Sequence, residues 1–256
     1  MTTTMMNSND PQLSSSEQML IANINYAFDT FSPIDEIQQL IEQLNPSSAN
    51  FQYDLSQTLG IITKFYYSLE FFIRSIPDFK ILTPSEQKSL FERNMLGIFS
   101  LGTLFFLHQS AFFQTTANEC LLLPLYGPDR LQQAKHICRQ FHSDTIIFKL
   151  LLVALAFSSN CYTLDRQCTI SKDSLLLGTF RLLGSQNVYV ELIWKYLIRQ
   201  SNHFSAVQRF SCLTKQILDI LQFSMDLYDT NSVYRTFIDD LIASNEEIFV
   251  PLWGKL

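Results

Sequence analysis

The sequence contains few residues that interrupt regular structure, with only 7 Gly and 8 Pro among 256 residues. Charged residues are also scarce, at 16% of the chain, whereas hydrophobic residues make up 47% and include 22 Phe. A disordered chain is far less apolar than this one. Because breakers are few, long helices are favoured over many short strands. We therefore predict an all-α fold with a large core.

Positive charge is scarce too, since the formal net charge is -6 and the pI is near 5.2. Without a basic stripe to attract phosphates, direct binding to nucleic acid is disfavoured. The five cysteines are odd in number and lack CxxC spacing, which fits neither a disulfide framework nor a zinc site. Reduced thiols in an intracellular compartment are the simplest interpretation.

Catalytic motifs are missing as well. No HExxH, GxSxG, P-loop or GxGxxG pattern occurs. Of the four histidines, His136 and His142 flank Cys138, but their spacing does not place both on one face of a helix. We therefore expect no enzyme activity, no metal and no cofactor.

No segment has the pattern of a signal peptide or a membrane span. Residues 1–12 are polar and are predicted to form a disordered tail, with one domain over 13–256. The apolar runs over 95–107 and 146–157 fall short of the roughly 20 residues that a spanning helix needs. Both runs are therefore predicted to be core helices, without contact to a membrane.

Two helix starts can be recognised from local chemistry. A serine run before Glu17 predicts a helix from about Ser14, because a hydroxyl can cap free backbone N–H groups. Thr83 is placed to cap a second helix, with Pro84 and Glu86 in its first turn. A hairpin or extended loop is predicted over 120–130, which holds two Pro and a Gly. Further helices are expected over 51–76, 130–142, 144–158, 172–200 with an interruption near Gly184, and 204–242.

The stretch "FIRSIPDFKILTPSEQKSLFERN", residues 72–94, resembles the signature of nuclear receptor ligand-binding domains. In that family the third helix ends in a basic residue, an Ile/Val-Pro-Gly-Phe turn follows, and a Leu-x-x-x-Asp-Gln-x-x-x-Leu-Leu pattern opens the next helix. Asp78 replaces the usual Gly of the turn. The matching residues are Arg74, Ile76, Pro77, Phe79, Leu82, Glu86, Gln87, Leu90 and Phe91.

The resemblance implies a three-layer antiparallel helical sandwich with a small β-hairpin, located in the nucleus or in cytoplasm and nucleus. It also implies a groove that receives a coregulator helix, with Arg74 capping the carbonyl end of that helix. The simpler alternative for Arg74 is a solvated charge at a helix end. The groove residues implied are Arg74, Phe79, Gln87, Lys88 and Phe91.

Two departures from the family weaken the coactivator site. Lys88 replaces a usually apolar lining residue, and Glu70 precedes Arg74 by one turn. The final helix normally supplies a Glu, but Lys255 stands there in "PLWGKL". The resemblance therefore favours corepressor over coactivator helices as partners. The candidates for the activation helix are Glu247, Pro251, Leu252, Trp253 and Lys255.

The ligand pocket implied by the family involves Leu69, Phe99 and Phe106, where Phe106 stands in place of a ligand-binding Arg. A small apolar ligand would fit such a pocket, although the density of Phe favours a pocket filled by its own side chains. The dimer seam of the family falls on residues 206–227, where Leu218 and Phe223 do not fit the inward-facing stripe. These residues predict a homodimer, or a heterodimer with a retinoid X-type receptor; burial within the domain is the alternative.

No zinc-binding DNA-recognition domain is encoded, since CxxC pairs are absent. The chain is thus either a fragment or a receptor without its own DNA reader. A second function class, an intracellular helical lipid-binding carrier without a transcriptional role, is motivated by the Phe-rich core alone.

Overall fold

The computed structural model describes residues 13–43, 55–114, 116–141, 144–158 and 175–244, and every regular element within these ranges is a helix. The prediction of an all-α fold is therefore confirmed for the described part of the chain. The elements are α1 (Ser15–Phe31), α2 (Ile34–Gln43), α3 (Leu55–Ser75), α4 (Pro77–Lys80), α5 (Pro84–Gln109), the 3-10 turn η1 (Phe112–Gln114), α6 (Thr116–Arg139), α7 (Thr145–Ala156), α8 (Leu175–Gln200), α9 (His203–Thr230) and α10 (Ser232–Ser244).

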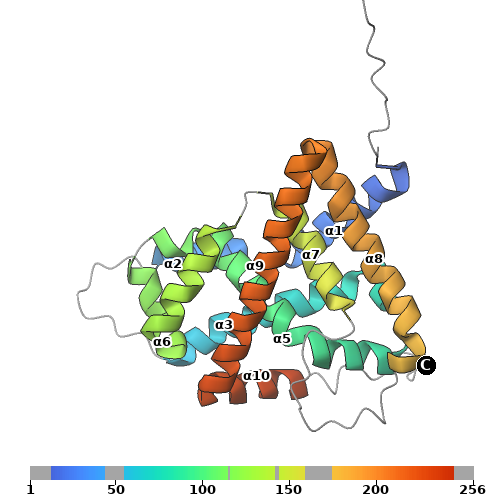
Figure 1. The fold of residues 1–256 in the computed structure, drawn as a ribbon. Helices are drawn as coiled ribbons and strands as arrows, with labels where there is room; N and C mark the ends of the chain where they lie inside the picture. The colour runs from blue at the N-terminus through green and yellow to red at the C-terminus, as the bar shows by residue number, and fades with distance from the viewer. Residues whose placement is uncertain (1–12, 44–54, 115, 142–143, 159–174, 245–256) are drawn as a thin grey trace, which may run out of the picture.

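Helix α5 is the centre around which the other helices pack (Figure 1). It contacts α3, α6, α7, α8, α9 and α10, and an unbroken run from Asn94 to Leu107 is buried. By length and hydropathy α5 could also cross a membrane, but 89% of its most apolar window is buried by its neighbours. A helix that is apolar all round is expected at the centre of a bundle of this size.

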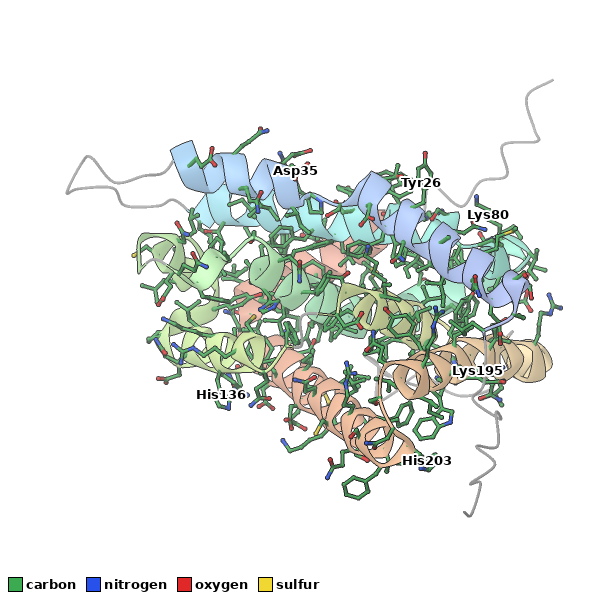
Figure 2. All side chains as sticks on the ribbon, turned by 90° about the horizontal axis from the view of Figure 1, so that it is seen from above. Tyr26, Asp35, Lys80, His136, Lys195 and His203 are labelled. Carbon is green, nitrogen blue, oxygen red and sulfur yellow. The ribbon has the colours of Figure 1, made fainter. Side chains whose placement is uncertain are left out.

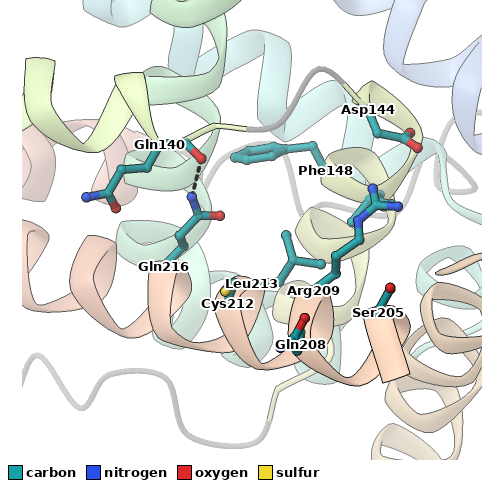
Figure 3. Close-up of a pocket in the computed structure, with 10 residues that line it drawn as sticks. Gln140, Asp144, Phe148, Ser205, Gln208, Arg209, Cys212, Leu213 and Gln216 are labelled. Carbon is teal, nitrogen blue, oxygen red and sulfur yellow. Dashed lines mark hydrogen bonds between the residues drawn. The ribbon is translucent and has the colours of Figure 1, made fainter. Parts of the chain in front are cut away.

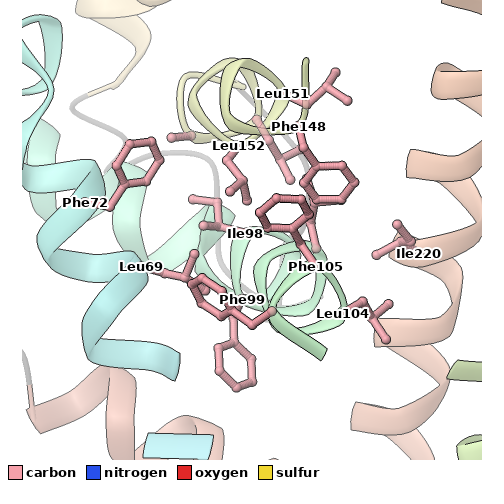
Figure 4. Packing of buried hydrophobic residues seen from close by; sticks show 14 of the residues in the cluster. Leu69, Phe72, Ile98, Phe99, Leu104, Phe105, Phe148, Leu151, Leu152 and Ile220 are labelled. Carbon is pink, nitrogen blue, oxygen red and sulfur yellow. The ribbon is translucent and has the colours of Figure 1, made fainter. Parts of the chain in front are cut away.

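The core joins side chains from α3, α5, α7 and α9 (Figure 4). Phe105 stacks on Phe148 with ring centroids 4.4 Å apart, which ties α5 to α7. On a neighbouring side of α5, Gly102 faces the fully buried Leu69 of α3. A Cβ at position 102 would lie 2.5 Å from Leu69 Cδ1, which is inside van der Waals contact. The absence of a side chain at Gly102 is what allows α3 and α5 to approach so closely.

Both predicted helix caps are confirmed. Ser14 and Glu17 form a reciprocal capping box at α1, and Thr83 and Glu86 form another at α5. Glu17 also pairs with Lys195 of α8 at 2.7 Å between Nζ and Oε1, so the cap ties α1 to α8. Figure 2 shows the position of Lys195. The hydrogen bonds from Lys195 and from Ser14 lower the pKa of Glu17 from 4.5 to about 2.

The hairpin predicted over 120–130 is wrong, because these residues belong to α6. Gly127 has φ 70°, ψ 168° and ends one helical segment, and Pro128 begins the next. Gly after a helix end and Pro at a helix start are both favourable, so the supposed breakers mark a kink between two helical segments. Gly184 does not interrupt α8, whereas the helix predicted over 204–242 is divided at Asn231, which caps α9 and α10.

We predict that Gly102→Ala destabilises the fold by about 1–2 kcal/mol, because overpacking against Leu69 outweighs the gain of roughly 1 kcal/mol in helix propensity. In a Leu69→Ala background, which itself costs about 2–5 kcal/mol, the same change should be neutral or stabilising. Urea unfolding of the four variants of this cycle measures the coupling. Gly184→Ala, where a new Cβ meets nothing within 4 Å, is the matched control and should stabilise α8. Equal effects at both glycines would contradict the close approach of α3 and α5.

Candidate functional site

The candidate site is the corner between α3 and α5, where the chain reverses through α4. Ile76 has extended φ and ψ of -64° and 128°, and Pro77 begins α4, so α3 cannot continue. Phe79 is 2% exposed and meets Phe91 edge-on, with ring centroids 5.9 Å apart. This aromatic pair anchors the corner to the core-facing side of α5.

Gln87 holds the corner from the α5 side. Its side-chain amide Nε2 donates to the carbonyl oxygens of Phe79 at 3.0 Å and Leu82 at 3.2 Å. The Phe79 carbonyl also accepts from the backbone N–H of Leu82 at 3.2 Å, so Gln87 adds a side-chain donor to a carbonyl that is already bonded. Gln87 therefore ties the start of α5 to the end of α4.

Arg74 lies in the last turn of α3 and is already held by contacts within the chain. Its Nε donates to Glu70 Oε1 at 2.7 Å, and its guanidinium carbon lies 5.5 Å from the centre of the Phe91 ring. The Glu70 side chain is fully buried, whereas the Arg74 side chain is 20% exposed. A buried carboxylate needs such a cation, because removing one partner of a buried pair leaves an uncompensated charge.

Lys88 lies on the outer side of the corner, one turn after Pro84. Its Nζ lies 3.7 Å from Glu92 Oε1, and both side chains are partly exposed. Exposed pairs of this kind contribute about 0–1 kcal/mol to stability. Among the predicted groove residues, Arg74, Phe79, Gln87 and Phe91 are thus brought into mutual contact, and Lys88 is beside them at the surface.

One residue of the corner was missed from the sequence. Tyr189 of α8 is fully buried, stacks on Phe157 at 5.8 Å, and donates its hydroxyl hydrogen bond to the carboxylate of Asp78. Burial, together with this bond, raises the pKa of Tyr189 far above its usual value. Asp78, which departs from the family pattern, therefore attaches the corner to α8.

The three predicted pocket residues are buried in the interior. Leu69, Phe99 and Phe106 are each at most 1% exposed. Phe106 lies among other rings, with centroid distances of 5.6 Å to Phe28 and 5.5 Å to Phe65. The space around the position expected to contact a ligand is therefore occupied by aromatic side chains.

The two predicted seam residues face different directions. Leu218 is 61% exposed on α9. Phe223 is only 1% exposed and packs edge-on against Tyr126 at 6.0 Å, so the expectation that it points away from the core is wrong. Phe223 is a core residue, because the face of α9 on which it lies packs against Tyr126 of α6.

The predicted activation-helix residues lie outside the described residues, as does the tail over 1–12. The structure therefore describes one side of the candidate groove only. Within the described ranges, no group of three or more His, Cys, Asp or Glu side chains is arranged to hold a metal ion. The activation-helix residues concerned are Glu247, Pro251, Leu252, Trp253 and Lys255.

We expect Tyr189→Phe to lower the free energy of unfolding by about 1–3 kcal/mol, since it removes a hydrogen bond to a charged group. The double variant Asp78→Asn, Tyr189→Phe should cost less than the sum of the two single changes. Chemical denaturation measures both. Tyr26→Phe is the control, because the Tyr26 side chain is 77% exposed and should contribute nothing measurable. Additive single effects would show that Asp78 and Tyr189 do not act as a pair.

A comparison with models of known protein families finds no match, and no curated protein matches the sequence. The contacts at the corner and the resemblance of residues 72–94 are therefore the basis for assigning a function.

Proposed function

We propose that this chain is a ligand-binding domain of the nuclear receptor type that regulates transcription in the nucleus by binding coregulator helices. The proposal includes the three-layer antiparallel arrangement of helices known from that family. The chain would read no DNA itself and would act through protein partners.

The observation that carries the proposal is the contact network of the corner. Residues that match the signature at separate points of the sequence meet in space, as Arg74 lies over Phe91, Phe91 packs on Phe79, and Gln87 bonds the Phe79 carbonyl. A chain that preserved the signature by chance would not be expected to join its members in one network. Arg74 lies in the last turn of α3 and its side chain is 20% exposed, at the place where a partner helix would present its carbonyl groups.

The same contacts support a preference for corepressor helices. Arg74 donates to the buried carboxylate of Glu70 and lies against the Phe91 ring, so a short Leu-x-x-Leu-Leu helix would compete with a charged group of the chain for this cap. A longer corepressor helix gains additional apolar contact and does not require the final helix to dock. Lack of a Glu at the Lys255 position weakens the binding of the short coactivator helix alone, by roughly 1–3 kcal/mol.

The packing around Phe106 supports an orphan domain with a reduced pocket. Three aromatic neighbours, Phe28, Phe65 and Phe105, lie within 6.5 Å of this ring between centroids. A lipid carrier requires an internal space of several hundred Å³. This packing favours a filled core over the carrier, and we propose activity that does not depend on a small apolar ligand.

A row of exposed side chains along α9 supports the proposed dimer. Phe204, Val207 and Leu218 are 71%, 42% and 61% exposed. Their positions, at intervals of three and eleven residues, return to the same side of an α-helix. This row would form the contact with a second copy or with a retinoid X-type receptor, while Phe223 remains in the core.

We expect a longer corepressor-like helix to bind the chain at least tenfold more tightly than a Leu-x-x-Leu-Leu peptide, without added ligand. Fluorescence anisotropy with labelled peptides measures both affinities. The double variant Glu70→Gln, Arg74→Gln removes both charges together, so that no buried carboxylate is left unpaired. It should weaken corepressor binding about tenfold, because the cap of the peptide carbonyls is lost.

Arg199→Gln is the matched control for this experiment, since Arg199 also lies in the last turn of a helix but at the end of α8. It should leave both affinities unchanged. Equal corepressor affinity for the wild-type chain and the double variant would exclude the corner as the binding site. Tighter binding of the coactivator peptide would retain the groove and overturn the preference for corepressors.

For the proposed dimer, we expect Leu218→Glu to convert an associating chain into a monomer, because a carboxylate in an apolar contact is strongly unfavourable. Sedimentation velocity over a range of concentrations measures the change, alone and with a retinoid X-type receptor. Met19→Glu on α1, where the side chain is 66% exposed, is the matched control and should have no effect. Unchanged sedimentation of Leu218→Glu would place the seam elsewhere.

A further inference from the structure

A cavity of about 330 Å³ lies between the start of α7 and the first half of α9 (Figure 3). Its apolar part is formed by Ile147, Phe148 and Leu213, and Arg209 and Cys212 reach it from α9. The cavity is separate from the corner at α4 and from the buried rings around Phe106. Its volume is at the lower end of the ~300–1,000 Å³ typical of small-molecule sites.

Among the described residues that line this cavity, Arg209 is the only cationic one, and its described partner is neutral. Its Nη1 donates to the side-chain oxygen of Gln200 at 2.9 Å. No ion pair joins Arg209 to any carboxylate of the described residues. A guanidinium has five N–H donors, so most of its capacity for a bidentate contact is still available.

Asp144 also lies at the cavity, but its two oxygens are occupied by groups of the chain. Oδ1 accepts from the backbone N–H of Ile146 at 3.1 Å, as the cap of α7. Oδ2 accepts from the amide of Gln200 at 2.6 Å. Gln200 therefore stands between Asp144 and Arg209, bonded to both. The Asp144 carboxylate is held as a helix cap, and the Arg209 guanidinium can receive an anion from outside the chain.

We propose that this cavity binds a small amphipathic carboxylate, such as a bicyclic aromatic acid. The aromatic body would lie on Ile147, Phe148 and Leu213, and the carboxylate would pair with Arg209. A long acyl chain would exceed the cavity, whereas a compact aromatic acid uses both its apolar and its charged side. This proposal does not rest on the coregulator function, because it uses other residues on other helices.

The position of Cys212 provides a direct test. Cys212 lies one turn after Arg209 at the cavity and is exposed, and Cys120 on α6 is exposed away from it. In a full chain with Cys161 and Cys168 replaced by Ser, we expect 2-naphthoate to slow alkylation of Cys212 by N-ethylmaleimide several-fold, as the bound acid covers the thiol. Alkylation of Cys120, followed in the same sample by peptide mass spectrometry, should not change.

The role of the charge is tested by comparing 2-naphthoate with the neutral 2-naphthamide. Arg209→Gln should raise the Kd of naphthoate about tenfold or more, as expected for loss of a charged hydrogen bond. It should leave the Kd of naphthamide unchanged, measured by ligand-observed NMR. Arg199→Gln is the matched control and should affect neither ligand. Cys212→Phe, which keeps Arg209 but fills the cavity, should abolish binding of both.

Three results would overturn the proposal. Naphthoate could fail to protect Cys212, or its Kd could be the same for the wild-type chain and Arg209→Gln. Alternatively, Cys212 could become protected simply by raising the protein concentration without naphthoate, which would identify a second chain as the occupant. The Leu218→Glu variant separates a second chain bound in the cavity from the dimer proposed through Leu218, because Leu218 is not among the α9 residues that line the cavity. Protection that persists in this variant would come from a second chain in the cavity.

Discussion

Burial of α5 constrains the helices packed against it, because a buried polar side chain is unfavourable unless it forms a hydrogen bond inside the protein. Asn94 donates from Nδ2 to the carbonyl oxygens of Ala156 at 3.0 Å and Ser158 at 2.6 Å, and thereby satisfies the end of α7. Ser100 bonds the hydroxyl of Ser224 on α9 at 2.6 Å. With Gly102 setting the approach of α3, three sides of α5 are each positioned by one residue. A small shift of α5 would break all three contacts together.

The position of the corner between α3 and α5 depends on how α5 is packed. Thr83 and Glu86 cap α5 where it leaves the core, so α4 must lie beside them, and Tyr189 attaches it through Asp78. The residues that resemble the receptor signature therefore stabilise the fold whether or not a partner binds. In the proposed complex, a peptide helix would compete with Glu70 and Phe91 for the guanidinium of Arg74. Affinity would then depend more on apolar contact than on charge.

The features that could be predicted from the sequence are those that depend on near neighbours. Each capping box joins residues that are three positions apart. Pro77 ends α3 because the residue before a proline is disfavoured in the helical conformation. The bond from Tyr189 to Asp78 spans 111 positions, and no local pattern indicates it. Phe223 lies three residues after the buried Ile220 and four before the buried Leu227, so helical spacing agrees with its burial. The inward-facing stripe predicted from the sequence is turned away from this face because it includes Val207, which is 42% exposed. Gly127 and Pro128 have the local pattern of a loop, although in the fold they end one helical segment and begin the next.

The two surfaces proposed for binding differ in how their arginine is neutralised. Arg74 is paired with a fully buried carboxylate, so a second anion there would have to compete with Glu70, whose burial without a cation is costly. Arg209 is bonded to a neutral amide, and the nearby Asp144 is already satisfied by Ile146 and Gln200. An incoming carboxylate at Arg209 therefore displaces no internal ion pair. Charge recognition is for this reason favoured at the cavity between α7 and α9, and shape recognition at the corner between α3 and α5.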